Sequence, residues 1–176
     1  GNLGDLTQRA VQALEDCDLV ACEDTRRTGG LLKHLGIEKP LQRFDDHAGE
    51  QAFDRVTATL LGGQTVAYCS DAGMPGILDP GYNLINLAIK NNIEMTVIPG
   101  PTAFVNALVL SGKPAHKFTF EGFLSNKSTA RRNRLKTLKT EGRTVVLYES
   151  PHRIKKLLAD ILEIYGDVEL ALAREL

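Results

Sequence analysis

The sequence predicts an α/β protein built on a mainly parallel sheet that is covered by helices on both faces. Short apolar runs of strand length alternate with segments in which apolar residues recur every three or four positions. Glycine and proline mark most of the junctions between these segments. The chain has 176 residues, 43% of them hydrophobic, which is enough to build the core of one ordinary domain or of two small ones.

The alternation of helices and strands runs without interruption through the first two thirds of the chain. Leu6, Ala10, Ala13 and Leu14 have helical spacing, and Gly36 is placed to end the second helix. The expected order is a helix after residue 5, a strand at 18–24, a helix at 29–36, a strand at 40–44, a helix at 49–63, a strand at 64–70, a helix at 79–92, a strand at 94–100 and a helix at 101–112.

The pattern changes at residues 113–118, where a new unit begins. We expect a strand at 117–124, a basic helix at 128–141, a strand at 144–150, a helix at 152–165 and a final strand at 168–176. This predicts two α/β domains, an N-terminal one over residues 1–112 and a C-terminal one over residues 113–176.

Composition and the absence of several motifs exclude some functional classes. The net charge of −1 gives no overall sign of a polyanionic partner. Three cysteines without paired spacing predict a reducing, cytoplasmic environment rather than a disulfide framework. Apolar runs are broken within about ten residues, whereas a membrane span needs about 20. The histidines are scattered and HExxH, CxxC, Walker A and GxSxG are absent, so we expect no metal site.

The segment 69–81, CSDAGMPGILDPG, has the strongest signature of a binding loop. It follows an expected strand, and ligands of open α/β sheets bind at the carboxyl ends of strands. Gly73 and Gly76 allow the backbone to approach a ligand closely, and Asp71 or Asp79 could accept hydrogen bonds from hydroxyl or ammonium groups. The alternative is a βα loop without a ligand, in which Asp79 caps the next helix.

Two further segments end strands at the same edge of the predicted sheet. In VIPGPTAFVNAL, the small residues Thr102 and Ala103 leave room for a planar group, and Thr102 can also cap the helix. Charged side chains follow an earlier strand, at Glu23, Asp24 and Arg26. Together these loops predict a shared ligand pocket, although the charged turn could equally be solvated.

A cluster of basic residues lies between positions 126 and 143. Seven of the chain's 21 lysines and arginines fall there, and such local concentration is typical of phosphate contacts. Arg132, Lys136 and Lys139 are spaced to form one stripe on a helix. The alternative is a solvated helix face.

Taken together and in order, these motifs resemble those of the tetrapyrrole methylase superfamily of S-adenosylmethionine-dependent enzymes, and within it those that methylate 16S rRNA. The resemblance covers the whole chain. The matching stretches are GNLGD at 1–5, EDTR at 23–26, SDAGMPGILDPG at 70–81, PGPTA at 99–103, EGFL at 121–124 with Lys127 and Ser128, ESPHR at 149–153 and AREL at 173–176. One departure is DHAGE at 46–50, where DHNE is usual.

The resemblance implies two α/β domains with a cleft between them, a homodimer, and S-adenosylmethionine bound in that cleft. It also implies that the first strand precedes Gly1 and that the second domain continues beyond Leu176. The substrate would be a cytidine 2′-hydroxyl of 16S rRNA in the 30S subunit, with no membrane association. The residues implied for cofactor binding are Asp71, Ala72, Gly73, Met74, Thr102, Ala103 and Tyr148.

Methylation of a ribose hydroxyl benefits from a general base, and the candidates are Asp24, Lys127 and Glu149. An ordinary lysine has a pKa near 10.4, so Lys127 would need a large shift to act as a base, and its alternative role is a phosphate contact. The residues expected to hold rRNA phosphates are Arg26, Arg131, Arg132, Arg134, Lys136 and Lys139. Two other functions stay open, methylation of a tetrapyrrole or other small molecule and RNA binding without catalysis.

Overall fold

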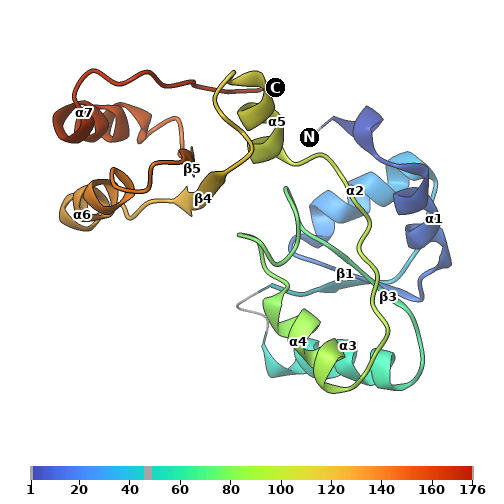
Figure 1. The fold of residues 1–176 in the computed structure, drawn as a ribbon. Coiled ribbons are helices and arrows are strands. Elements are labelled where there is room, and N and C mark those ends of the chain that lie inside the picture. The colour runs from blue at the N-terminus through green and yellow to red at the C-terminus, as the bar shows by residue number, and fades with distance from the viewer. Residues whose placement is uncertain (1, 46–48, 176) are drawn as a thin grey trace. The chain divides into compact units, whose positions relative to one another are not determined.

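The computed structural model describes residues 2–45 and 49–175, and the chain forms two compact units, Gly1–Pro101 and Thr102–Leu176. The α/β fold class is confirmed (Figure 1). The first unit contains a 3₁₀ turn Leu3–Asp5, α1 Gln8–Asp16, β1 Leu19–Cys22, α2 Thr25–Leu35, β2 Leu41–Arg43, α3 Glu50–Leu61, β3 Val66–Cys69 and α4 Tyr82–Lys90. The second contains α5 Ala103–Leu110, β4 Phe118–Phe123, α6 Ser128–Leu138, β5 Thr144–Tyr148 and α7 Ile154–Tyr165.

The sheet of the first unit is parallel, with the strand order β2-β1-β3. All four residues of the central strand β1 are buried, because both faces of the sheet are covered. Val20 packs with Leu14 and Leu32, from α1 and α2. Its neighbours in β1 face the other way, where Ala21 clusters with Val56 of α3. Figure 1 shows α1 and α2 on one side of β1 and β3, and α3 and α4 on the other.

Local signals in the sequence explain where the helices of the first unit begin and end. Gly36 adopts a φ of 71° after α2, the left-handed conformation that glycine tolerates without strain. The side chain of Thr7 caps α1 by accepting a hydrogen bond from the Ala10 amide at 3.1 Å. Asn2 accepts a hydrogen bond from the Gly4 amide at 2.9 Å, so the opening turn is closed by its own side chain.

The expected strands at 94–100 and 168–176 were wrong, because the described residues of both segments form no strand. Met95 and Val97 are 48% and 66% exposed, and Leu172 is 67% exposed. Apolar residues with strand propensity form a strand only where a neighbouring strand supplies hydrogen bonds, and neither segment belongs to a ladder among the described residues.

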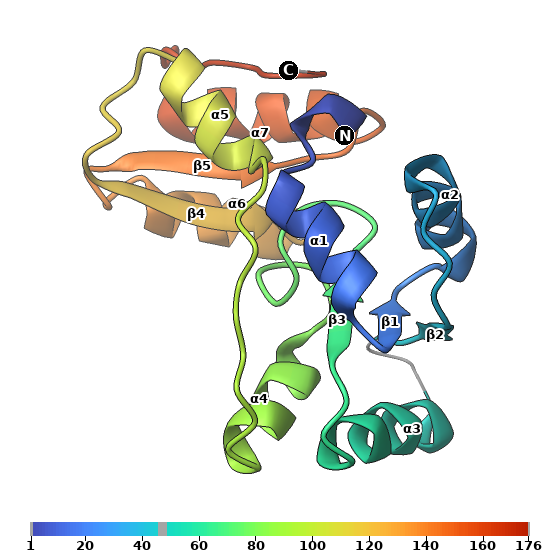
Figure 2. The same cartoon turned by 90° about the vertical axis from the view of Figure 1, so that its right-hand side faces the viewer.

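In the second unit, β4 and β5 pair in parallel, with a leucine-rich core on one face and aromatic contacts on the other. On one face, leucines of α6 and α7 form a core with Leu124, which follows β4, and with β5 residues. These leucines are Leu135, Leu138 and Leu157, and the β5 residues are Val145 and Leu147. On the alternate positions, Tyr148 and Phe120 lie edge to face, and Phe120 stacks on Phe104 of α5 at 4.2 Å between ring centroids. Figure 2 shows α5 on the opposite side of the two strands from α6.

Helix α5 therefore groups with the strands that follow it. Besides the stacking, the Phe104 amide donates a hydrogen bond to the Tyr148 hydroxyl at 3.2 Å. The contacts divide the chain between Pro101 and Thr102, whereas the sequence placed a boundary after residue 112. The division of the protein into domains at that residue stays a prediction.

No helix within residues 2–45 and 49–175 is long and apolar enough to cross a membrane.

Replacing Leu135 by alanine tests the packing of α6. Leu135 is 2% exposed, so Leu135→Ala removes buried methyl groups and leaves a cavity. We expect the free energy of unfolding of the second unit to fall by about 2–5 kcal/mol, as measured by urea denaturation. Leu162→Ala on α7 is the control, because Leu162 is 61% exposed and its loss should change stability by less than about 0.5 kcal/mol. Equal effects of the two variants would contradict the assignment of this core.

Candidate functional site

The carboxyl ends of β1 and β3 bring two of the expected loops together. These strands are parallel neighbours, and Cys22 pairs in register with Cys69, so the residues that follow them meet at one edge. The Glu23 carboxylate accepts a hydrogen bond from the Asp71 amide at 3.1 Å. The Arg27 guanidinium lies 3.5 Å from the Asp71 carboxylate. Strand pairing thus joins segments that are 48 residues apart in the sequence.

The loop at 70–81 folds back on its own backbone. The Gly76 amide donates hydrogen bonds to the carbonyls of Asp79 and Pro80. Gly73 adopts a φ of 80°, and a Cβ atom there would lie 2.7 Å from Oδ2 of Asp79. Gly81, not Asp79, occupies the cap position of α4, and no side chain caps that helix. The alternative in which Asp79 caps α4 is therefore wrong, and the Asp79 carboxylate lies beside the backbone of Gly73.

The carboxylates around this loop repel one another. Burial raises the pKa of Glu23, and the negative charges of Asp79, Asp71 and Asp45 raise it further. The pKa of Asp79 is raised by burial and by Asp71. One oxygen of Asp71, Oδ1, is buried and accepts no hydrogen bond from the described residues. The edge of the first sheet therefore holds acceptor oxygens in excess of the donors around them, and a ligand with amino or hydroxyl groups would supply the missing donors.

Asp24, a candidate base, is engaged by its own helix. Its Oδ1 accepts a hydrogen bond from the Arg26 amide at 2.8 Å, which caps α2. The Arg26 guanidinium binds both carboxylate oxygens, at 3.0 and 2.6 Å. These hydrogen bonds with Arg26 hold the pKa of Asp24 well below its usual range. An anion stabilised in this way is a weak proton acceptor.

In the second unit, three of the residues implied for cofactor binding lie close together. Thr102 occupies the cap position of α5, but its side chain does not cap the helix. Instead, the Tyr148 hydroxyl accepts a hydrogen bond from the Phe104 amide. This contact connects the end of β5 to the start of α5, beside Ala103. The other four, Asp71 to Met74, belong to the loop of the first unit.

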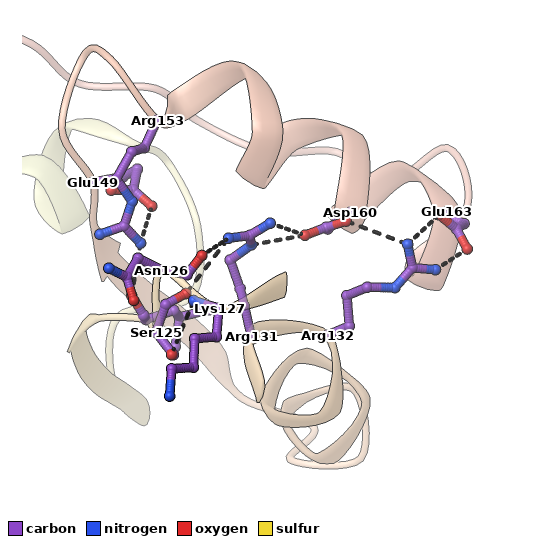
Figure 3. A network of polar contacts seen from close by, with 10 residues as sticks. Ser125, Asn126, Lys127, Arg131, Arg132, Glu149, Arg153, Asp160 and Glu163 are labelled. Atoms are coloured by element: carbon purple, nitrogen blue, oxygen red, sulfur yellow. Dashed lines mark hydrogen bonds and ion pairs between the residues drawn. The ribbon is translucent and has the colours of Figure 1, made fainter. Parts of the chain in front are cut away.

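The remaining two candidate bases follow the carboxyl ends of β4 and β5. The Glu149 side chain is only 3% exposed; its Oε1 accepts a hydrogen bond from the Ser150 amide, and its Oε2 lies 3.2 Å from the Arg153 guanidinium. Lys127 is exposed and occupies the cap position of α6. Figure 3 shows its side chain extending away from the ion pairs around it.

Arginines of the basic helix α6 are largely engaged in ion pairs within the second unit. Arg131, expected to bind RNA, is buried and pairs with Asp160 of α7 at 2.6 Å. Arg132 bridges Asp160 and Glu163 on the same helix (Figure 3). The sequence pattern did not reveal these pairs, because the acidic partners lie 28–31 residues further along the chain.

Two more cations of this segment have partners. Arg134 pairs with Glu121 at 2.6 Å, where a bulge in β4 adds one residue, and its side chain is still 44% exposed. The Lys139 ammonium donates to the Ile164 carbonyl at 2.8 Å and so binds the end of α7. Lys136 is exposed and has no partner within the part of the chain that the structure describes. Much of the charge of this helix therefore serves its own fold.

The remaining described groups add no further candidate site. Among residues 2–45 and 49–175, no cluster of three or more His, Cys, Asp or Glu side chains could hold a metal ion. Burial raises the pKa of Cys69 to about 11. An open cavity of about 290 Å³ lies at the amino ends of β4 and β5, lined by Pro114, His116, Lys117, Gly142, Arg143 and Thr144. The departure from the DHNE pattern at Ala48 lies outside the described residues.

Both units are parallel α/β folds whose loops at the carboxyl ends of the strands carry the candidate site residues. A family model described as Tetrapyrrole (Corrin/Porphyrin) Methylases matches residues 1–176, and the chain belongs to this family.

Curated relatives show which members of the family this chain is similar to. The chain is 47% identical over 176 residues to Ribosomal RNA small subunit methyltransferase I of Thermotoga maritima, and 45% identical over 177 residues to the protein of that name from Escherichia coli O157:H7. Each match covers all of this chain, but only 79% of the first relative and 62% of the second.

Solved structures support the fold. Diphthine synthase is similar with a TM-score of 0.70 at 16% identity, covering 92% of this chain and 68% of that one. The cobalt precorrin-4 methyltransferase CbiF is similar with a TM-score of 0.69 at 13% identity, covering 95% of this chain and 72% of that one. At such identities the likeness concerns the fold alone.

Asp79→Asn tests the repulsion among the carboxylates. Because the pKa of Asp79 is raised in the folded state, its charged form destabilises the fold, and stability is lost as the pH rises from the ordinary value of 3.8 through the raised pKa. We expect Asp79→Asn to melt at a higher temperature than the parent at pH 7. This advantage should shrink as the pH falls through that window and vanish below it. Thermal melts across the pH range measure it.

Asp54→Asn, an exposed substitution on α3, is the control and should change stability by less than about 0.5 kcal/mol at any of these pH values. An Asp79→Asn variant that is no more stable than the parent at pH 7 would contradict the assignment.

Proposed function

We propose that the protein containing this chain is an S-adenosylmethionine-dependent methyltransferase that methylates the 2′-hydroxyl of a cytidine in 16S rRNA. The observation that carries the proposal is the match of the whole chain, at 43–47% identity, to relatives named Ribosomal RNA small subunit methyltransferase I. The chain spans less than two thirds of the length of most of these relatives.

The loop at 70–81 fits the proposed cofactor. S-adenosylmethionine, when bound, supplies an electrophilic methyl group. Its ammonium and ribose hydroxyl groups are hydrogen-bond donors, and Asp71 offers a buried oxygen that lacks a donor. Ala72 and Gly73 present backbone with little side chain, which allows close approach. We assign Asp71, Ala72, Gly73 and Met74 to one part of the cofactor site, and Thr102, Ala103 and Tyr148 to another.

Among the three candidate bases, the contacts favour a role for Lys127 next to the substrate. Asp24 is held as an anion by Arg26, and Glu149 is buried and bound to Arg153. Lys127 is exposed, and its ammonium has no partner among the described residues. We propose that it meets the ribose hydroxyl or the adjacent phosphate, while Glu149 acts by holding Arg153.

The proposed RNA surface is smaller than the sequence suggested. We leave Arg131 out because its guanidinium is buried against Asp160. Lys136 is exposed and unpaired within the described residues. The exposed or part-exposed cations Arg26, Arg132, Arg134 and Lys139 remain candidates, because surface ion pairs are weak enough to exchange a carboxylate for a phosphate. Further proposals are the 30S subunit as the physical substrate, a homodimer and a cytoplasmic location.

Methylation of ribosomal RNA is tested directly. The full-length protein, S-adenosylmethionine and unmethylated 30S subunits or 16S rRNA are incubated together, and nuclease digests of the rRNA are analysed by mass spectrometry. We expect a cytidine that is heavier by one methyl group on its ribose. Unmodified rRNA together with methylated tetrapyrrole would support a small-molecule enzyme instead. Cofactor binding without transfer to either substrate would leave an RNA-binding module.

Gly73→Ala tests the cofactor loop. A Cβ atom at Gly73 would meet Oδ2 of Asp79 and force the loop to move, since φ there is 80°. We expect the affinity for S-adenosylmethionine to fall at least tenfold, as measured by calorimetry, a loss of about 1.4 kcal/mol. Gly63→Ala is a matched control because Gly63 has a φ of 79° and open space around its Cβ position. It should carry the same backbone strain and bind the cofactor as the parent does.

A further inference from the structure

The segment between β4 and α6 is held by its main-chain carbonyls. The Arg153 guanidinium donates a hydrogen bond to the Leu124 carbonyl at 2.8 Å. The Arg131 guanidinium lies 3.5 Å from the Ser125 carbonyl and 3.3 Å from the Asn126 carbonyl. Three successive carbonyls are thus bound by two arginines that come from different helices or their ends, as Figure 3 shows for the residues around Lys127.

Each of these guanidinium groups is fixed by a buried carboxylate. Arg131 binds Asp160 through two nitrogens, at 2.7 and 2.6 Å, and the two side chains are only 6% and 10% exposed. Arg153 lies 3.2 Å from Glu149, whose side chain is 3% exposed. Arg131 binds the carboxylate through Nε and Nη2 and the carbonyls through Nη1, a geometry that the planar fork of a guanidinium offers and an ammonium group does not. Arg153 makes both of its contacts through Nη2. Asp160 therefore orients Arg131 as well as neutralising it, whereas Glu149 forms an ion pair with Arg153 without a hydrogen bond from it.

Joining α6 to α7 does not by itself explain the contacts of Arg131. Arg132 makes ion pairs with the same acidic helix, to Asp160 and Glu163, without touching the segment. Arg131 differs in that it also binds the Ser125 and Asn126 carbonyls, which have no strand or helix partner of their own.

The segment ends on Lys127, whose backbone is held from both sides. Its amide donates to the Ser125 hydroxyl at 3.2 Å, and its carbonyl accepts from the Arg131 amide at 3.0 Å in the first turn of α6. The backbone of Lys127 is therefore fixed while its side chain is exposed.

We propose that Arg131 and Arg153 are positioning residues, which hold the Leu124–Asn126 backbone and so set the direction in which Lys127 reaches the substrate. This inference rests on the proposed function, since it assumes that Lys127 acts beside the reacting ribose. Neither arginine touches the substrate in this role. A misplacement of a positioned group by about 1 Å can reduce a rate about a hundredfold.

Conservative variants separate positioning from charge. Arg131→Lys keeps the positive charge beside Asp160 but cannot bind the carboxylate and the two carbonyls at once. Arg153→Lys keeps the charge beside Glu149 but ends one bond short of the position of Nη2, the atom that binds the Leu124 carbonyl. We expect kcat for rRNA methylation to fall at least tenfold in each, towards the value of Lys127→Met, while KM for S-adenosylmethionine changes less than twofold. Leu138→Ala is the control, because it removes packing from the same core (Leu138 is 2% exposed) without removing a hydrogen bond to the segment. Its kcat below the melting temperature should stay within twofold of the parent.

Two outcomes of the kinetics would overturn the proposal. One is an Arg131→Lys enzyme that is folded and retains kcat within twofold. The other is an equal loss of kcat in Leu138→Ala, which would mean that the rate follows stability. Should the arginine variants fail to fold, Ser125→Ala provides a surface substitution that removes only the acceptor of the Lys127 amide. It should lower kcat at least threefold, and an unchanged kcat would count against the proposal.

Amide hydrogen exchange tests the inference independently of the activity. In Arg131→Lys, exchange of the Lys127 amide should rise at least tenfold relative to the amides of β5, and in Leu138→Ala the ratio should stay as in the parent. If the Lys127 amide exchanges faster in Arg131→Lys but the parent protein does not methylate rRNA, the proposed function is refuted, whereas the role of Arg131 in positioning the segment stands. Unchanged exchange in an active enzyme would refute the positioning role and keep the function.

Discussion

Parallel pairing of strands is the constraint from which the candidate sites of both units follow. Where strands run in parallel, their carboxyl ends lie at one edge, and whatever follows each strand is brought there. Cys22 pairs with Cys69 in the first unit, and Phe123 with Tyr148 in the second. The first pairing assembles the acidic loop, and the second places Lys127 and Glu149 beside the same pair of strand ends. The rest of each unit secures the pairing by packing helices against both faces of its strands, and in β1 it buries all four residues.

Much of this architecture could be predicted from the sequence, and the failures share a physical cause. Gly36 and the buried strand β1 are local signals, and both were identified. The strands expected at 94–100 and 168–176 depended on a partner that a local pattern cannot reveal. The same holds for α5, where Thr102 was placed to cap the helix and the Tyr148 hydroxyl, 44 residues from Phe104, accepts the hydrogen bond instead.

The site residues also divide into those with a local signal and those that depend on a distant partner. The glycines and aspartates of the loop at 70–81 predicted a binding loop, and in the structure its Asp71 amide donates a hydrogen bond to Glu23. For the basic helix, the sequence showed the cations but not which of them would meet a carboxylate. Burial of Arg131 against Asp160 depends on helix packing, and a stripe of charge on a helical projection contains no information about it. Charge concentration therefore predicted a surface, whereas part of it supports the interior of the second unit.

Holding a segment by its carbonyls has an evolutionary consequence. Every amino acid supplies the same main-chain oxygen, so the contact of Arg131 with residue 126 is indifferent to the side chain there. Asn126 is exposed, and its side chain makes no hydrogen bond or ion pair with the rest of the described residues. This position can therefore vary among descendants of the protein, and adjust what it meets outside, without moving the lysine that follows it. Conservation would fall on the two arginines and their carboxylates, while the residue nearest the lysine would be free to drift.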